Sequence, residues 1–508
     1  MKTWRKGGWQ QGLAGWLLAS ATVAAPAWAE GGKAQAGEKP AAADQRSEED
    51  MFSEGEEVEG AAPVKLASTA TPSSGKGSDA EPEGSDLGDA RMTGAARENT
   101  DLLTRDRTQI GGFFYLRTAA MLAEDQKVSD AALSNSTLFD TYLDSRVNDR
   151  VRAYARGRLT YNPLANAGGT VAGGGQSGLG GLGMGAASTD EVRASLTQLW
   201  LKFDIDRKVF ITAGRQFVRW GASRFWNPVD VLNTTRFNPL LFFDDRVGPT
   251  MIKAHLPIES LGWNLYAILL SEDAAKLEQL GVALRGEAVF GQVELGLSTV
   301  ARKGMDPKVG LDVSAGVWDF DLTGEAAVWF PQGEDPRWQA SMGLSWTWAF
   351  GEDDSLILGA EYFHNPSGVT ADAVVKSYTD YAIASATGGK PQAPSFMPMY
   401  TGRDYVGALA VLISPGSWSD GIITGLALWN LTDSSGTTQI NVSTRVLTDL
   451  TVELYAGASF GDGEFRGYVP KLKEAFAPMA ALMPDGQALL DSLKAPLVRG
   501  GLNFRVDL

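Results

Sequence analysis

Four arginines fall on one face of a single short stretch of the sequence. In DRVRAYARGRLTYN, residues 149–162, they are Arg150, Arg152, Arg156 and Arg158, here called the arginine row, and small or apolar residues stand between them. Successive side chains of a β-strand point to opposite faces, so this spacing predicts a strand with one wet, positive face and one dry face. A positive wall attracts anions, and if it lines a passage it favours anionic solutes.

A second group of charged positions is acidic and is expected on other strands of the same wet face. This acidic row consists of Asp319, Asp321 and Glu325, with Glu287, Glu294, Glu361 and Glu453 adding to it. The two rows could create a transverse field, or pair and fill the interior. They could also form a generic solvated lining with no strong selectivity.

A third group lies in the loop at residues 220–247. Its polar members, counted from the adjoining Arg219, are Arg219, Arg224, Asn227, Asp230, Arg236, Asp244, Asp245 and Arg246. Six aromatic residues stand among them, which is more apolar surface than a loop in water favours. We expect this loop to fold inward, where its charges would set ionic preference at a constriction. The alternative is a loop that packs on its own aromatics and only closes a rim.

Catalysis finds little support in the sequence. The chain has 2 histidines, His255 and His364, and 0 cysteines, so a zinc or Ser-His arrangement has no spacing signal. We expect no enzyme, metal or cofactor, with a hydrolase built on one histidine as an open alternative. The Gly-rich run at 168–186 lacks the Lys-Ser or Lys-Thr of a phosphate loop. A net charge of -16 disfavours nucleic-acid binding.

The elements that position these residues are strands separated by unequal loops. We expect about 18 strands, with 16 as the other possible count, at 110–122, 137–145, 149–162, 190–204, 208–219, 248–258, 262–271, 279–290, 291–302, 307–317, 318–330, 337–350, 354–364, 403–414, 418–431, 435–447, 449–460 and 497–508. Every second connection is tight, and the long loops fall between the others. This alternation is typical of an all-β transmembrane antiparallel barrel, which we expect over residues 109–508.

Aromatic residues and two irregular strands refine this prediction. Trp338 and Trp348 share a face ten residues apart, which in a tilted strand spans roughly the 25 Å between the aromatic girdles of such barrels. Trp318 and Phe330 are expected to repeat this spacing on the neighbouring strand. The apolar parity changes between Leu196 and Leu199, and a β-bulge at Gly214 would settle which way Arg215 faces.

The first residues of the sequence are typical of an export signal. Basic residues precede an apolar run and the small residues Ala27-Trp28-Ala29, which predicts a signal peptide at 1–29. Residues 30–108 are rich in Ala, Gly, Ser, Pro and Glu, so we expect a disordered acidic periplasmic tail. A docking peptide around Met51 and Phe52 is the alternative. Near the other end, residues 471–494 have helical spacing broken by Pro478 and Pro484, and could form a cap or a lid.

Two segments resemble a known family. GRQFVRWG at 214–221 with FWNPVD at 225–230, and LFDTYLDSRVNDRVRAYARGRLTYN at 138–162, are similar to Gram-negative outer-membrane porin-like barrels, including alginate-export-type porins. The resemblance implies a passive channel of unknown substrate. Such proteins usually end on Phe or Trp, whereas this chain ends on Leu508, with Phe504, Val506 and Leu508 in outward register.

Together these observations predict an outer-membrane channel for passive diffusion of small polar or charged solutes. Its expected partners are the lipid bilayer and lipopolysaccharide, the barrel-assembly machinery and small solutes, with no nucleic acid. A non-conducting barrel that anchors or displays loops is the alternative. The oligomeric state stays open.

Overall fold

The computed structural model describes residues 107–164, 191–233, 236–241, 246–351, 354–394, 396–481 and 486–508. The chain divides into two compact units, Met1–Glu57 and Val58–Leu508, and all described residues belong to the second. The predicted signal peptide, nearly all of the predicted tail, and Asp244 and Asp245 of the 220–247 loop lie outside the described residues.

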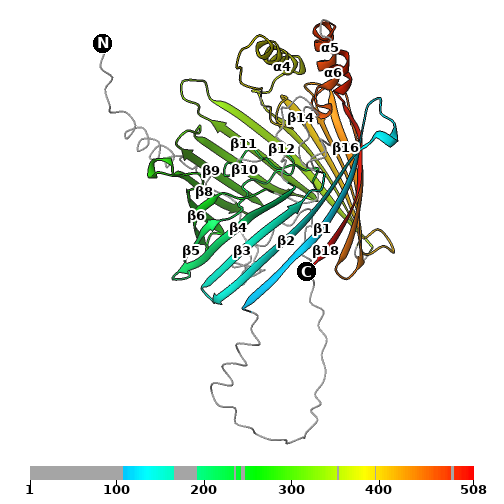
Figure 1. Ribbon diagram of the computed structural model, residues 1–508. Helices are drawn as coiled ribbons and strands as arrows, with labels where there is room; N and C mark the ends of the chain where they lie inside the picture. Colours follow the sequence, from blue (N-terminus) through cyan, green and yellow to red (C-terminus); the bar gives the residue numbers. More distant parts are fainter. Residues whose placement is uncertain are drawn as a thin grey trace, which may run out of the picture. The chain divides into compact units, whose positions relative to one another are not determined.

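Eighteen strands form one closed antiparallel sheet (Figure 1). β1 pairs with both β2 and β18, so the sheet has no free edge. The strands are β1 Thr108–Ala123, β2 Ala132–Asn148, β3 Val151–Tyr161, β4 Val192–Ile205, β5 Val209–Arg215, β6 Thr250–Ile258, β7 Trp263–Leu270, β8 Gly281–Phe290, β9 Val293–Arg302, β10 Lys308–Val317, β11 Phe320–Trp329, β12 Arg337–Phe350, β13 Asp354–His364, β14 Asp404–Ile413, β15 Gly421–Asn430, β16 Ser435–Leu447, β17 Leu450–Phe460 and β18 Pro496–Asp507. The predicted antiparallel barrel and its strand count are confirmed.

The two faces of the barrel wall differ in polarity. Side chains alternate along each strand, so one set faces the interior and the other faces out. In β9 the side chain of Ser298 is 1% exposed, whereas the adjacent Leu297 is 57% exposed. Trp338 and Trp348 are both exposed, on one face of β12, as the sequence predicts. Trp318, in contrast, lies in the turn between β10 and β11, because it has a positive φ of 55° that ends the strand.

Of the two strands with irregular patterns, β4 contains a bulge and β5 does not. The register between β3 and β4 shifts where Arg156 pairs with Gln198 and Gly157 pairs with Leu196. Thr197 is therefore the extra residue, which places Leu196 and Leu199 on the same outer face. The β4–β5 ladder runs without a shift through Gly214, so the bulge expected there was wrong. Gly214 is required for a different reason, since its φ is 130° and an added Cβ would lie 2.1 Å from the carbonyl oxygen of Leu199.

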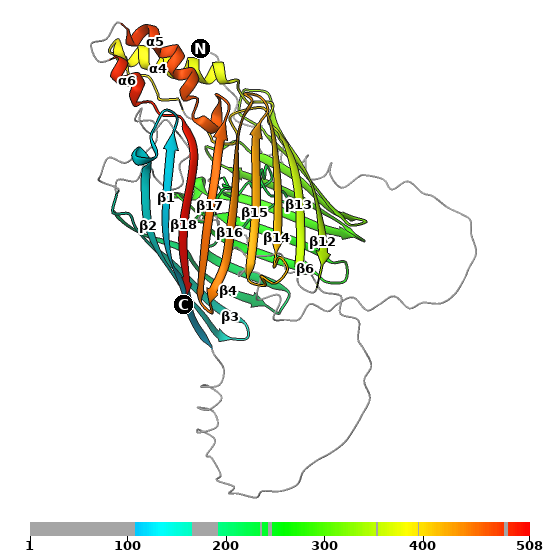
Figure 2. The ribbon, with the colours of Figure 1, turned by 90° about the vertical axis from the view of Figure 1, so that its right-hand side faces the viewer.

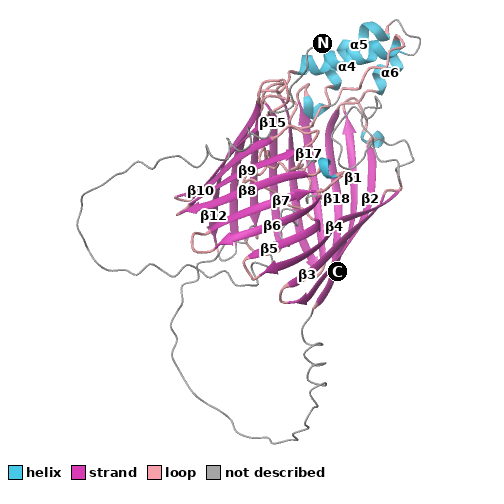
Figure 3. Ribbon diagram, turned by 90° about the vertical axis from the view of Figure 1, so that its left-hand side faces the viewer, coloured by secondary structure: helices cyan, strands magenta, loops and turns pink. Residues whose placement is uncertain are grey.

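Within the described ranges, helices occur only in connections between strands, and the α-helices occur in the two long connections before β14 and before β18. The α-helices are α4 Ala371–Ala386, α5 Val469–Ala480 and α6 Gly486–Ser492, and the short 3-10 helices are η1 Val128–Asp130, η3 Leu277–Gln279 and η4 Glu464–Arg466. Figures 2 and 3 show α4, α5 and α6 together at one end of the barrel, opposite the C-terminus. They share an apolar core that includes Val374, Tyr378, Leu472, Phe476 and Leu490. None of the described helices is long and apolar enough to cross a membrane.

The helical prediction for residues 471–494 matches α5 and α6. Helix α5 continues through Pro478, so the interruption expected there was wrong, and Pro484 lies outside the described residues. Helix α4 was expected only as part of a long loop. Its apolar positions at Ala371, Val374, Val375 and Tyr378 have helical spacing, and the side chain of Thr370 caps its first turn by accepting from the backbone N–H of Ala373. This signal could have identified it.

Candidate functional site

The connection between β5 and β6 is described at residues 216–233, 236–241 and 246–249, here called the lumen loop, and it is held by side chains from the far side of the barrel. Glu325 on β11 accepts the backbone N–H of Ser223 at 2.6 Å and that of Val229 at 3.1 Å. Ser341 on β12 lies 2.8 Å from the hydroxyl of Ser223. Because β11 and β12 are at least five strands away from β6 in the sheet, these bonds place the lumen loop inside the barrel.

A second glutamate, Glu361 on β13, anchors the same loop. Its carboxylate accepts the backbone N–H groups of Arg224 at 2.8 Å, Phe225 at 3.1 Å and Trp226 at 2.7 Å. The sequence placed Glu325 and Glu361 in an acidic lining. The structure instead gives both of them a role in satisfying backbone donors of the buried loop.

The lumen loop is apolar enough to be buried. Trp226 is 1% exposed, and its ring stacks on Phe363 of β13 with centroids 5.7 Å apart. Val229 packs into a separate cluster with Met251 and Ile268 of the barrel wall. The expectation that this loop folds inward is therefore confirmed for its described residues, since burial of these side chains offsets the cost of ordering the loop.

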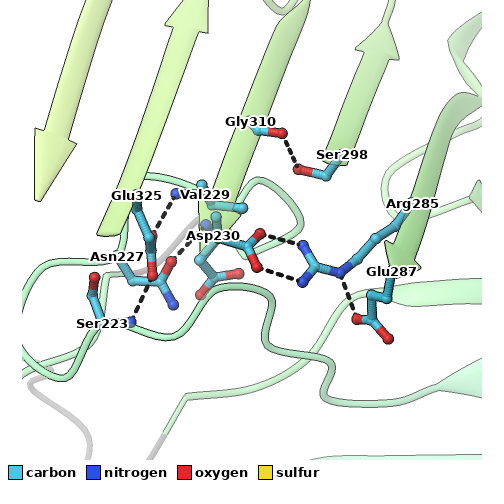
Figure 4. Close-up of polar contacts among 10 residues, drawn as sticks. Ser223, Asn227, Val229, Asp230, Arg285, Glu287, Ser298, Gly310 and Glu325 are labelled. Carbon is cyan, nitrogen blue, oxygen red and sulfur yellow. Dashed lines mark hydrogen bonds and ion pairs between the residues drawn. The ribbon is translucent and has the colours of Figure 1, made fainter. Parts of the chain in front are cut away.

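Glycine is needed where the lumen loop approaches Glu325. The φ of Gly221 is 98°, and an added Cβ would lie 2.5 Å from Oε1 of Glu325 and 2.4 Å from Oδ1 of Asn227. Figure 4 shows Asn227, Val229 and Asp230 beside Glu325, with the Arg285–Glu287 pair close by. Any larger residue at position 221 would push the loop away from its anchor.

The charged side chains of the lumen loop are of two kinds, a buried ion pair and arginines that donate to backbone carbonyls. Asp230 and Arg246 form a buried ion pair with an N–O distance of 2.9 Å. Burial raises the pKa of Asp230, although the charge of Arg246 opposes this shift. Arg219 donates to the carbonyl of Ser223, and Arg236 donates to the carbonyl of Asn227 at 3.1 Å.

These two arginines also lie against aromatic rings. The guanidinium of Arg219 is 5.4 Å from the centre of the Phe237 ring, and that of Arg236 is 5.1 Å from the Tyr400 ring. Within the described parts of the chain, neither they nor Arg224 have a carboxylate at ion-pair distance. The lumen loop therefore carries three positive charges that no described carboxylate neutralises by direct contact.

The arginine row is neutralised by aspartates on neighbouring strands. Arg152 forms a two-point pair with Asp144 of β2, at 2.8 and 2.6 Å, and both side chains are buried. Arg156 and Arg158 share Asp140, at 2.5 and 2.8 Å. The sequence showed the arginines on one face, but their partners depend on the cross-strand register.

Arg150 departs from the prediction in another way. It lies between β2 and β3 rather than within a strand, and it pairs with Asp204 of β4 at 2.8 Å. With a side chain 50% exposed, it sits at the rim formed by the short turns. The ion pairs described for the arginine row are therefore with Asp140, Asp144 and Asp204, none of which belongs to the acidic row.

The remaining acidic positions are dispersed. Asp319 lies in the turn between β10 and β11, whereas Asp321 and Glu294 lie within β11 and β9 and are exposed. Glu287 pairs with Arg285 at 2.7 Å, and Arg285 forms a two-point pair with Asp312 at 2.7 and 2.9 Å. The structure therefore provides local pairs in place of one continuous acidic wall.

The histidines occupy separate environments. Nε2 of His255 is 3.0 Å from the side-chain oxygen of Asn264, and Nδ1 of His364 is 2.7 Å from Asp404. Among the described residues, no group of three or more His, Cys, Asp or Glu side chains is arranged to hold a metal ion.

Comparison with known proteins gives the following result. No protein-family model matches the sequence, and no curated protein matches it. The chain is similar to the solved structure of OccAB3 from Acinetobacter baumannii, at 9% identity over 80% of this chain and 100% of that chain, with a TM-score of 0.45. It is also similar to a BenF-like porin from Pseudomonas fluorescens Pf-5, at 10% identity over 79% of this chain and 98% of that chain, with a TM-score of 0.46. It is similar as well to a triple mutant of the Rhodopseudomonas blastica porin, at 10% identity over 79% of this chain and 100% of that chain, with a TM-score of 0.38. The assignment of the fold rests on this chain's own closed strand ladder.

Proposed function

We propose that this chain is an outer-membrane, porin-like channel through which small polar or charged solutes diffuse passively. The observation that supports this most directly is the closed 18-stranded barrel whose outer face is apolar and whose inner face carries charge. Large apolar side chains such as Leu297, Leu344 and Leu454 are about half exposed on the outside. A continuous apolar exterior of this kind is costly in water and favourable in a lipid bilayer.

The width of the barrel supports a hydrated interior. Barrels of 16 to 18 strands leave an aqueous channel, whereas 8 strands leave only enough room for side chains. The lumen loop narrows that interior by crossing from β5 and β6 to Glu325 and Glu361. We therefore place the constriction of the channel at the lumen loop.

The charge of the constriction favours anions in this proposal. The guanidinium groups of Arg219, Arg224 and Arg236 lie on the lumen loop without a described carboxylate at ion-pair distance. Positive charge in a narrow passage of low dielectric raises the local concentration of anions. Selectivity therefore depends on the lumen loop more than on the arginine row, because Asp140, Asp144 and Asp204 neutralise most of that row.

A non-conducting anchor is the second candidate, and one observation favours it. Phe113, Tyr115 and Leu138 form a buried apolar cluster on the inner side of β1 and β2. Part of the interior is therefore filled with side chains rather than water. If the chain is a non-conducting anchor, the part that it displays is the group of helices α4, α5 and α6.

Solute flux into vesicles tests the two candidates. The refolded chain in phospholipid vesicles should admit a small neutral sugar and a small anion of similar size, the anion faster at low salt. Vesicles that contain correctly inserted barrel but swell no faster than empty vesicles would support the anchor. Resistance of the barrel to SDS unfolding at room temperature provides the check that it is inserted.

A further inference from the structure

Glu464 joins three segments at the end of the barrel that carries the helices. It is the first residue of η4 and is 7% exposed. Its carboxylate accepts the backbone N–H of Met399 at 2.6 Å, the hydroxyl of Tyr405 on β14 at 2.7 Å and the side-chain amide of Asn430 on β15 at 2.9 Å. Donors from the segment before β14, from β14 and from β15 thus meet at one acid.

Met399 connects this acid to the lumen loop. Its backbone N–H points to Glu464, and its carbonyl accepts the indole N–H of Trp226 at 2.8 Å. The φ of Met399 is 64°, a left-handed conformation that a residue with a side chain adopts only when its surroundings hold it there. Trp226 is in turn tied to β13 by Glu361. The Met399 peptide is therefore a direct link between Glu464 and the constriction.

Apolar side-chain contacts connect Glu464 and the lumen loop in the same way as the hydrogen bonds do. Phe465, next to Glu464, belongs to one apolar cluster with Met399, Tyr400, Phe225 and Trp226. A change in the position of η4 is thus transmitted to the lumen loop by side-chain contacts as well as by hydrogen bonds.

No described cation pairs with Glu464. Arg466, on the same element, pairs with Glu124. The ionisable groups that face Glu464 from the packed elements are Asp433 beside β15, Tyr405 on β14 and Tyr468 before α5. Asp433 accepts the backbone N–H of Glu464 at 2.8 Å, so two carboxyl groups share one small buried region.

This environment changes the acidity of Glu464. Burial raises its pKa to about 7, with a further contribution from the charge of Asp433, while the hydrogen bonds from Tyr405, Met399 and Asn430 oppose the shift. The carboxyl group thus titrates within the physiological range.

We propose that Glu464 is a positioning residue for the lumen loop, acting through Met399 on Trp226, and that loss of its proton loosens the constriction. The proposal rests on the channel function proposed above and names its regulation. The sign follows from linkage. Ionisation of Glu464 places a second negative charge beside Asp433 in a buried region without a described cation, and this repulsion favours displacement of η4 together with the Met399 peptide. A carboxyl group whose pKa is raised by burial stabilises the buried arrangement fully below its ordinary pKa, and this stabilisation is lost as the pH rises through 7. The loop is therefore held at acidic pH and released at alkaline pH.

The test combines two independent measurements. The first is single-channel conductance from pH 5.5 to 8.5. The second needs no conduction. Since the chain has 0 cysteines, Ala222→Cys places a single thiol on the lumen loop, and its labelling by a water-soluble maleimide reports how freely the loop moves. The labelling rate of the protein with Glu464 is divided by that of the Glu464→Gln variant. Both proteins carry the same thiol, so the ratio removes the pH dependence of the reactivity of the thiol.

Glu464→Gln mimics the protonated, neutral side chain and should hold the loop at all pH values. The protonated fraction of a group with a pKa near 7 falls from about 90% at pH 6 to about 10% at pH 8. We therefore expect the labelling ratio of the native acid to the glutamine variant to rise roughly fivefold or more across this range. Asp433→Asn removes the repulsion and should move the midpoint to lower pH. Glu278→Gln, at an exposed acid in η3, is the matched control and should leave the midpoint unchanged.

The outcomes separate this inference from the proposed function. A pH-dependent labelling ratio in a barrel that does not conduct would support the link from Glu464 to the loop and overturn the channel. Conduction with a labelling ratio that stays flat from pH 6 to 8 would overturn the link and leave the channel standing. A midpoint unaffected by Asp433→Asn would also contradict the proposed environment of Glu464.

Discussion

Oε1 of Glu361 lies 2.7 Å from the backbone nitrogen of Trp226, although the two residues belong to opposite parts of the barrel. The same carboxylate accepts from the next two backbone nitrogens towards the N-terminus, those of Phe225 and Arg224. One buried acid thus satisfies three consecutive donors of a turn, much as capping groups satisfy the first turn of a helix. The lumen loop is fixed to the far wall by this contact.

Removing this acid should free the loop. Glu361→Ala leaves three buried N–H groups without an acceptor, each costing about 1–3 kcal/mol if it stays buried, so the loop should detach instead. We expect a larger and noisier single-channel conductance and faster proteolysis within residues 216–249. Glu294→Ala, near the short-turn end of β9, should change neither measurement. An unchanged conductance in a folded Glu361→Ala barrel would show that the loop does not limit the passage.

The arginine row should act on stability. Arg152→Gln leaves Asp144 buried and unpaired, which typically costs about 3–5 kcal/mol. The urea midpoint for unfolding of the barrel in detergent, followed by tryptophan fluorescence, should therefore fall. The double variant Asp144→Asn, Arg152→Gln should recover most of the loss, because neither position then carries a charge. A double variant no more stable than the single one would contradict the pairing.

Selectivity should depend on Arg236. Arg236→Gln removes one positive charge from the lumen loop, and the permeability ratio of chloride to potassium, measured from reversal potentials under a salt gradient, should fall roughly twofold. The effect should fade in 1 M salt, where the Debye length is about 3 Å. Arg150→Gln, at the short-turn rim, is the matched control and should alter the ratio less. Equal effects of Arg236→Gln and Arg150→Gln on the permeability ratio would show that the lumen loop does not set the selectivity.

Trp226→Phe should uncouple the loop from Glu464. The substitution keeps an aromatic ring against Phe363 but removes the N–H that donates to Met399. We expect the labelling ratio at Ala222→Cys to lose most of its pH dependence while conduction persists. A full pH response in this variant would show that the coupling does not pass through the Met399 peptide.

The barrel itself could be predicted from the sequence because its signals are local. Alternation of polar and apolar residues depends only on neighbours along the chain, as in Leu297 and Ser298, and the lengths of the turns can be read directly. The two irregular strands were predicted less well. The change in parity between Leu196 and Leu199 is explained by the extra residue Thr197, which only the pairing of β3 with β4 reveals. The bulge expected at Gly214 in the next strand is absent from the β4–β5 pairing.

The site was predicted only in part, since its contacts join residues distant in the sequence. The inward folding of the lumen loop followed from its aromatic content. The neutralisation of Arg156 and Arg158 by Asp140 depends on the register between β2 and β3. The roles of Glu361 and Glu464 depend on which backbone donors reach them across the barrel, and no spacing along the chain encodes this.

Single-channel recording of the refolded chain in planar bilayers, with reversal potentials under a salt gradient, tests the central claim most directly. The account predicts steady conductance with anion preference, and a reduction of that preference by Arg236→Gln. A correctly inserted barrel that gives no conductance at any pH between 5.5 and 8.5 would contradict the channel. It would leave the anchor, with its displayed helices, as the function to test.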